Sequence, residues 1–170
     1  MSAADERVQA LAERLAPELL NYFARRVTPT ADAADLLSET LLILCRRAHH
    51  LPDDDLQARL WAFGVARKVL AGQRRSTKRR SALVERLQEE LEQTYRTEHR
   101  DLSVERLHTA LTTLKPLDRE IIRLVHWEGF SQAEVAQILK RPAGTIRSRY
   151  TRARSALKAE LGDLRRQGNH

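Results

Sequence analysis

The chain has 170 residues, a formal net charge of +7 and a pI near 10.2, and aromatic residues make up only 5% of it. This length allows one domain or two very small ones, and the basic balance favours an acidic partner, either nucleic acid or an anionic membrane surface. No apolar run approaches the ~20 residues of a membrane span, and charges interrupt the first stretch, so we expect neither signal peptide nor membrane insertion. Cys45 is the only cysteine, which excludes an intramolecular disulfide and fits a cytoplasmic location.

Helix-forming residues dominate the composition, and no run of alternating β-branched residues predicts a strand. We therefore predict an all-α protein with two small helical domains, at 5–80 and 103–162, joined by a charged and partly helical connector at 81–102. The positive excess lies in the last third, since residues 103–170 carry 13 Lys and Arg against 7 Asp and Glu.

The N-terminal domain begins with a predicted helix over residues 5–26, which Thr28, Pro29 and Thr30 end. A second helix is predicted from about Ala31 to His49, and it has more apolar residues than one core-facing stripe requires. This surplus is either a second buried face or a docking surface for another protein. The main stripe is Leu37, Leu41, Leu44 and Ala48, and the residues that widen it are Leu36, Leu42 and Ile43.

A loop follows at Leu51–Asp55, with Pro52 and three consecutive aspartates. The spacing of apolar residues then predicts a third helix from about Leu56 to Arg75. Its end is strongly basic, because seven basic residues and no acidic residue lie between Arg67 and Arg80.

The C-terminal domain is predicted to contain four helices, beginning near Ser103, and Gly129 ends the second of them. Ser131 and Glu134 form a capping box at the start of a short third helix. Lys140 to Gly144 form a turn, and the last helix runs from Pro142 or Ala143 to Leu161. Two helices joined by so short a turn are typical of a DNA-binding helix-turn-helix.

The last helix separates its residues into two faces. Ile146, Tyr150, Ala153 and Leu157 form an inward stripe, and the opposite face carries hydroxyl and guanidinium groups. Six basic residues and no acidic residue lie between Arg141 and Lys158. A solvated basic helix is the alternative, but the capping box, the short turn and the absence of acids together favour reading of duplex DNA.

These residues resemble a known family. The segments 117–120, 128–131, 133–136, 144–149 and 152–154 resemble the fourth region of the sigma factors of bacterial RNA polymerase, and the nearest group is the extracytoplasmic-function (ECF) type. The resemblance implies that the last helix reads the −35 element, chiefly with Arg147, Ser148, Thr151 and Arg152. The full set of predicted −35 contacts is Arg141, Thr145, Arg147, Ser148, Arg149, Thr151, Arg152, Arg154 and Ser155.

The N-terminal domain resembles the second region of the same family. Segment 32–40 resembles the helix that binds the clamp coiled coil of the polymerase largest subunit, and segments 61–63 and 65–67 resemble the helix that opens and reads the −10 element. The Leu51–Leu56 loop sits where the family captures a flipped base. The implied polymerase contacts are Asp32, Asp35, Leu36, Leu37, Glu39, Thr40 and Ile43. The implied −10 contacts are Trp61, Phe63, Arg67, Lys68, Arg74 and Arg75.

Three features depart from the family pattern. Lys68 stands where Asn is frequent and Gly72 where Asp is frequent, and Lys68 offers a point charge in place of two-sided hydrogen bonding. Asp53, Asp54 and Asp55 make the capture loop acidic, which should repel phosphates. We expect these departures to alter the −10 specificity and the strength of promoter melting.

Two groups of residues have competing interpretations. Trp61 and Phe63 either stack on unpaired bases or belong to the core. Cys45 is either a core residue or a redox sensor, and its proximity to His49 and His50 does not provide the spacing of a zinc site. We therefore expect no metal.

The sequence is best explained as a sigma factor whose partners are promoter DNA, core RNA polymerase and, as is common in the family, an anti-sigma protein. No catalytic constellation is present in the sequence, so we expect neither enzymatic activity nor a cofactor. Two alternatives remain open. The chain could be a stand-alone helix-turn-helix regulator, or a sigma-like decoy that binds polymerase without melting promoters.

Overall fold

A computed structural model describes residues 2–77 and 102–167, and the described residues form helices and no strand. The all-α prediction is confirmed. The helices belong to two compact units. Residues 81–101 of the predicted connector lie outside the described residues. Within the described segments, no helix combines the length and the apolar character that a membrane span requires.

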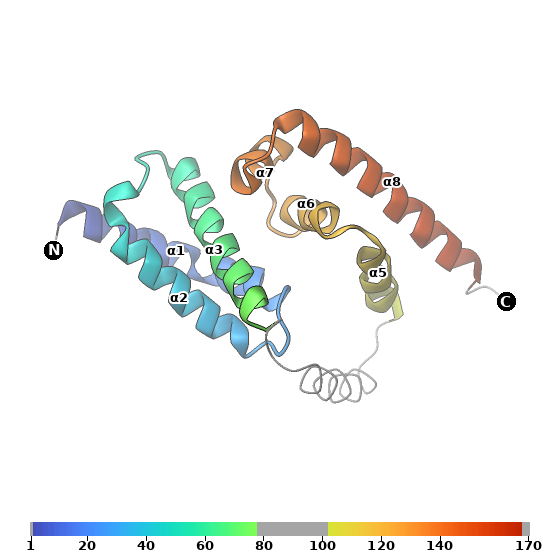
Figure 1. Cartoon of the computed structure of the whole chain (residues 1–170), viewed down its shortest axis with the longest axis horizontal. Coiled ribbons are helices and arrows are strands. Elements are labelled where there is room, and N and C mark those ends of the chain that lie inside the picture. Colours follow the sequence, from blue (N-terminus) through green and yellow to red (C-terminus); the bar gives the residue numbers. More distant parts are fainter. Residues whose placement is uncertain (1, 78–101, 168–170) are drawn as a thin grey trace. The chain divides into compact units, whose positions relative to one another are not determined.

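The N-terminal unit is a bundle of α1 (Ala3–Ala24), α2 (Asp32–Arg46) and α3 (Asp55–Thr77), with a short 3-10 helix η1 (Ala48–His50) after α2 (Figure 1). Its centre is aromatic. Phe23 and Phe63 are fully buried, and the Tyr22 ring meets the Phe63 ring edge to face with centroids 5.6 Å apart. Such contacts add to the apolar burial that holds α3 against α1.

A capping box that the sequence analysis did not identify starts α1. The Ser2 hydroxyl accepts from the Asp5 backbone N–H at 3.2 Å, and the Asp5 carboxylate accepts from the Ser2 N–H at 2.8 Å. These bonds satisfy two donors that the helix itself leaves unpaired. The hydrogen bonds from Ser2 favour the charged carboxylate and lower the pKa of Asp5 below its usual value.

The buried face of α2 differs from the predicted stripe. Ala33, Leu36, Thr40 and Leu44 are buried, whereas Leu37 and Leu41 are only half-buried at the edge of this face. Thr40 can lie in the core because its hydroxyl donates to the Leu36 carbonyl at 2.7 Å. A polar residue satisfied by its own helix is compatible with burial, and a purely apolar pattern misses it.

The C-terminal unit consists of α5 (Leu102–Thr113), α6 (Pro116–His126), α7 (Gln132–Leu139) and α8 (Ala143–Gln167) (Figure 1). Buried Ala153 of α8 packs with apolar residues of α5 and α6, and Tyr150 and Leu157 pack against this cluster. Ile146 is 0% exposed. The predicted inward stripe of the last helix is therefore confirmed, although α8 extends beyond the predicted end at Leu161.

Local geometry fixes the helix-turn-helix. The predicted capping box at α7 is present, with the Ser131 N–H donating to the Glu134 carboxylate at 2.7 Å and the Glu134 N–H to the Ser131 hydroxyl at 3.2 Å. Gly129, with φ of +74°, allows the chain to leave α6. Lys140 has φ of +51°, and the Arg141 N–H closes the turn onto the Ala136 carbonyl at 3.0 Å. The tight turn thus sets the start of α8.

Candidate nucleic-acid interface

The face of α8 opposite the core is exposed and carries donors. Its hydroxyl groups bond the helix's own backbone, since Ser148 donates to the Thr145 carbonyl at 3.2 Å and Thr151 to the Arg147 carbonyl at 3.0 Å. Each hydroxyl oxygen keeps acceptor capacity for a partner. The predicted −35 residues that are exposed are Arg141, Thr145, Arg147, Ser148, Thr151, Arg152, Arg154 and Ser155.

Within the part of the chain that the structure describes, the exposed arginines of this face have no internal counter-ion. Among the residues that the structure describes, no carboxylate pairs with Arg141, Arg147, Arg152 or Arg154. The Arg152 guanidinium donates from Nε to the Ser148 carbonyl at 3.4 Å. A row of unpaired guanidinium groups on one helix face matches what phosphates and base edges accept.

Arg149 differs from its neighbours. Its Nη1 lies 2.8 Å from Oδ1 of Asp118 in α6, and the two side chains are only 31% and 20% exposed. A carboxylate of the same unit holds its guanidinium, so Arg149 is less available than its neighbours, and its contact with DNA stays a prediction. Arg149 joins α8 to α6 and so helps to set the orientation of the exposed face.

The residue after Asp118 also has a structural contact. The Arg119 guanidinium donates to the carbonyls of Leu111 at 2.9 Å and of Thr112 and Leu114 at 3.1 Å each. The last carbonyls of a helix lack partners within the helix, so Arg119 closes the C-terminal end of α5. Within the resembling segment 117–120, Asp118 and Arg119 therefore hold helices together.

The predicted −10 contacts on α3 differ in how exposed they are. Lys68, Arg74 and Arg75 are exposed, and Trp61 and Arg67 are half-buried. The prediction for Phe63 is wrong, because its ring is 0% exposed and packs against Tyr22 in the core. A buried ring cannot stack on an unpaired base without opening the bundle.

The predicted polymerase contacts on α2 also divide. Leu36 and Thr40 are buried, so the predictions for these two residues are wrong. Asp35 and Glu39 are exposed, and Asp32, Leu37 and Ile43 are half-buried. Leu42 is a large apolar side chain of α2 that is exposed, at 57%. Leu42 widens the predicted apolar stripe of this helix, but it was not among the predicted polymerase contacts.

Cys45 follows this face and is exposed, so the expectation that it belongs to the core is wrong. His49 and His50 stack on each other, with ring centroids 4.1 Å apart. No group of three potential ligands for a metal ion occurs among the described residues.

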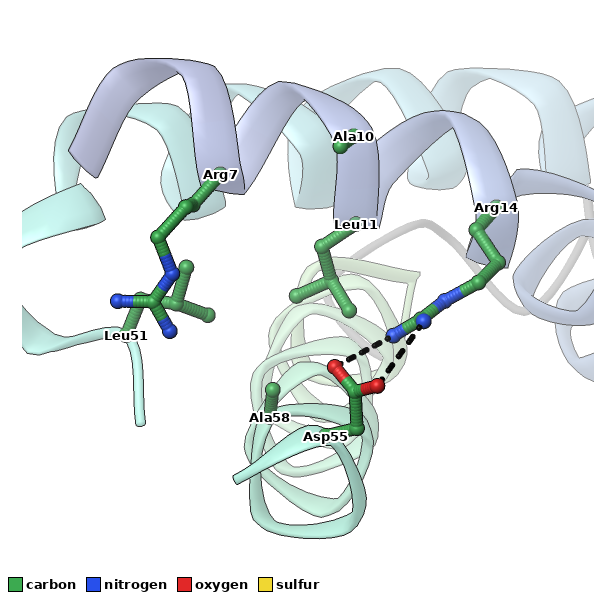
Figure 2. A pocket seen from close by; sticks show the side chains of 7 residues that line it. All are labelled: Arg7, Ala10, Leu11, Arg14, Leu51, Asp55 and Ala58. Atoms are coloured by element: carbon green, nitrogen blue, oxygen red, sulfur yellow. Dashed lines mark hydrogen bonds and ion pairs between the residues drawn. The ribbon is translucent and has the colours of Figure 1, made fainter. Parts of the chain in front are cut away.

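The acidic loop before α3 is paired with α1. Arg7 Nη1 lies 2.8 Å from Asp53 Oδ1, and the two guanidinium nitrogens of Arg14 lie 3.4 and 3.5 Å from the Asp55 carboxylate oxygens. Asp54 caps α3, since its Oδ1 accepts from the Gln57 N–H at 2.8 Å. Figure 2 shows Arg7 and Arg14 reaching down from α1 on either side of Leu11.

Comparison with known proteins places this geometry in a family. The sigma-70 region 2 model matches residues 11–80 and the sigma-70 region 4 model matches residues 104–157. These two matches, on a helical bundle and a helix-turn-helix unit, define a transcription factor of the sigma-70 class. Such factors direct RNA polymerase to promoters, and this assignment agrees with the exposed donors on α8.

Full-length relatives narrow the assignment. The ECF RNA polymerase sigma factor SigL of Mycobacterium tuberculosis is 30% identical over 159 residues, which is 92% of this chain and 90% of the relative. The ECF sigma factor EcfG of Rhodopseudomonas palustris is 33% identical, over 84% of this chain and 78% of the relative. The chain belongs to the ECF sigma factor family.

A solved structure supports the fold. The sigma factor RpoE of Bartonella quintana, in complex with the anti-sigma factor NepR, superposes with a TM-score of 0.64. The match has 23% identity and covers 87% of this chain and 92% of that one.

Proposed function

We propose that this chain reads the upstream promoter duplex with α8 and docks on core RNA polymerase with α2. It opens and holds the −10 strand with Leu51–Arg75, that is, with the loop before α3 and with α3 itself. It has no catalytic step of its own and acts in the cytoplasm with the polymerase. The observation that carries the proposal is the division of α8 into a buried stripe and an exposed face of hydroxyls and of arginines that meet no carboxylate among the described residues.

The exposed face of α8 suits duplex DNA because of the size of the helix and the hydrogen-bond donors that it carries. An α-helix fits the major groove of B-form DNA, where arginine can bond guanine with two donors and Ser or Thr can bond several bases. Arg147 and Arg152 are exposed, and their side chains are free to adjust to a base edge or a phosphate. Arg149 is less available to this interface because Asp118 holds it.

Three side chains of α3 suit single-stranded DNA because they lie along one side of the helix. Trp61, Lys68 and Arg75 recur every seven residues, so they lie close to one line along the helix. An exposed cation and a half-buried aromatic ring on one line can hold a phosphate backbone and stack a base, as single-strand binding requires. Arg67 and Arg74 extend the positive charge beside this line.

Exposed and half-buried side chains of α2 suit it to dock on the polymerase. Leu42 is exposed between half-buried Leu41 and Ile43, and Asp35 and Glu39 are exposed nearby along the helix. Apolar side chains with an acidic border suit a partner helix that is basic and apolar. We propose that this surface, with Leu42 in place of Leu36 and Thr40, contacts the polymerase.

An inhibitory protein is a further proposed partner. The Bartonella quintana sigma factor is bound to an anti-sigma factor in its crystal. In this chain Val104 and Leu107 of α5 are exposed, at 62% and 38%. An exposed apolar pair on a helix is a surface that a regulatory protein could cover.

The proposal is tested by transcription from fragmented genomic DNA with reconstituted polymerase and mapping of the transcript starts. The wild-type chain should give starts that share an upstream element. Arg147→Ala/Arg152→Ala should lower these transcripts about tenfold or more, because each lost base or phosphate contact costs about 1–3 kcal/mol. Lys115→Ala, which removes an exposed cation of the same unit outside α8, should transcribe as wild type.

Two outcomes would contradict the proposal. Polymerase binding without any transcript would favour a sigma-like decoy. Sequence-specific duplex binding without polymerase binding would favour a stand-alone regulator. Leu42→Asp distinguishes the docking claim, because it should weaken capture of core polymerase while an exposed position leaves the fold intact.

A further inference from the structure

The three aspartates of the loop before α3 each have a separate partner in the structure. Asp53 pairs with Arg7, Asp55 pairs with Arg14, and Asp54 caps the first turn of α3. Both arginines belong to α1, more than forty residues earlier in the chain. The acidic run is therefore a set of attachment points between a loop and a distant helix.

Arg7 bonds the loop at two places. Its Nη1 bonds the Asp53 carboxylate at 2.8 Å, and its Nη2 donates to the Pro52 backbone carbonyl at 2.9 Å. A planar guanidinium that bonds a side chain and a backbone carbonyl restricts the path of the loop, which a side-chain contact alone would not do.

Arg14 holds the other end of the loop. It lies seven residues after Arg7, so both project from the same side of α1, about two turns apart. Between them is a pocket of about 300 Å³, lined also by Leu11, Leu51 and Ala58. Figure 2 shows the bidentate approach of Arg14 to Asp55 across this pocket.

The pairing also changes the electrostatics of the loop. Three carboxylates in sequence would repel an approaching phosphate backbone. The Arg7 and Arg14 cations balance Asp53 and Asp55, and the N-terminal end of α3 favours the negative charge of Asp54. The acidic sequence thus presents much less negative charge than its composition suggests.

We infer that Arg7 and Arg14 are positioning residues that fix and neutralise the Pro52–Asp55 loop so that it can hold the unpaired −10 strand. This inference rests on the proposed function. Both pairs are exposed, with Asp53 and Asp55 at 97% and 85%, so they contribute little to the stability of the bundle. Their effect should therefore be visible in loop order and strand opening and not in unfolding.

The first test measures loop order in the full chain without DNA. Amide hydrogen exchange at residues 51–58 should be faster in Arg7→Ala/Arg14→Ala than in wild type, with the thermal midpoint nearly unchanged. Gln9→Ala/Glu13→Ala removes a bonded pair from the same helix that does not touch the loop, and it should exchange as wild type. Equal exchange in all three proteins would overturn the inference.

The second test measures strand opening by permanganate reactivity of −10 thymines, with holoenzyme on the strongest promoter mapped above. Arg7→Ala/Arg14→Ala should lower reactivity about two- to tenfold, while upstream duplex binding is unchanged. Arg7→Asp should lower it as well. Arg7→Asp/Asp53→Arg should recover part of it, because the ion pair is rebuilt with reversed charges while the hydrogen bond to the Pro52 carbonyl stays lost.

The outcomes distinguish failure of the positioning role from failure of the proposed function. Wild-type holoenzyme that opens the promoter together with variants that open it equally would overturn the positioning role alone. Wild-type holoenzyme that opens no promoter would overturn the proposed function, and the inference with it.

Discussion

The arginines of the two units differ in what faces them. In the N-terminal unit, Arg7, Arg14 and Arg59 each meet a carboxylate from another element, the last at 2.8 Å from Glu18. In the C-terminal unit, the exposed arginines of α8 meet no carboxylate among the described residues, and Arg149 is the exception. These three arginines of the N-terminal unit join its elements, whereas the exposed arginines of α8 are available to a partner.

The difference shows that local basic charge does not identify a binding residue. Arg149 and Arg147 are two positions apart in the same basic run, yet only Arg149 has an internal counter-ion. What separates them is Asp118, which lies on another helix. Substitutions of arginines that bond within their own unit, or of their partners, test whether these arginines form a class distinct from the exposed arginines of α8.

The largest effect on stability is expected at Arg119, whose guanidinium closes the end of α5. Arg119→Ala should lower the free energy of unfolding of the C-terminal unit by about 2 kcal/mol, because carbonyls of α5 lose a charged donor. Denaturant unfolding measures this loss. Arg119→Lys should recover only part of it, since an ammonium group cannot span the same carbonyls, and full recovery would contradict the capping role.

A smaller effect is expected at the half-buried pair between α6 and α8. Arg149→Ala and Asp118→Ala should each lower the free energy of unfolding by about 1–2 kcal/mol, and the double variant should lose little more than either. A double-mutant cycle of unfolding measures the coupling. Additive losses would show that the two side chains do not depend on each other and would return Arg149 to the DNA-contacting class.

The smallest effect is expected at the Arg59–Glu18 pair of the N-terminal unit. Glu18 is half-exposed, so Glu18→Gln should change the free energy of unfolding by less than about 1 kcal/mol. Thermal unfolding at low and high salt measures it. The small difference between wild type and variant should shrink as salt rises, and a loss as large as that of Arg119→Ala would contradict the description of this pair as a weak, partly exposed contact.

Much of the fold could be predicted because its signals are local. The inward stripe of α8 follows from the helical period of Ile146, Tyr150, Ala153 and Leu157, and the α7 capping box follows from two residues three apart. Helical spacing and capping depend on neighbours in sequence, so no knowledge of tertiary contacts is required.

The features that sequence reasoning missed are mostly contacts between residues far apart in the chain. The partner of Arg149 lies 31 positions away, and those of the acidic loop lie more than forty positions away. Phe63 is buried because Tyr22 of another helix packs on it. Thr40 is a different case, because its own helix satisfies its hydroxyl and allows a polar residue into the core. Sequence spacing predicts which faces exist, while partners across the fold decide which charges remain free.

The most direct test is the salt dependence of upstream duplex binding, measured with holoenzyme and the mapped promoter by fluorescence anisotropy. For wild type the logarithm of affinity should fall steeply with the logarithm of salt, by about 0.9 per neutralised phosphate. Arg147→Ala/Arg152→Ala should bind more weakly and with a shallower slope, whereas Lys115→Ala, which removes an exposed cation outside α8, should keep the wild-type slope. If the double variant retains both wild-type affinity and wild-type slope, the exposed face of α8 does not contact DNA.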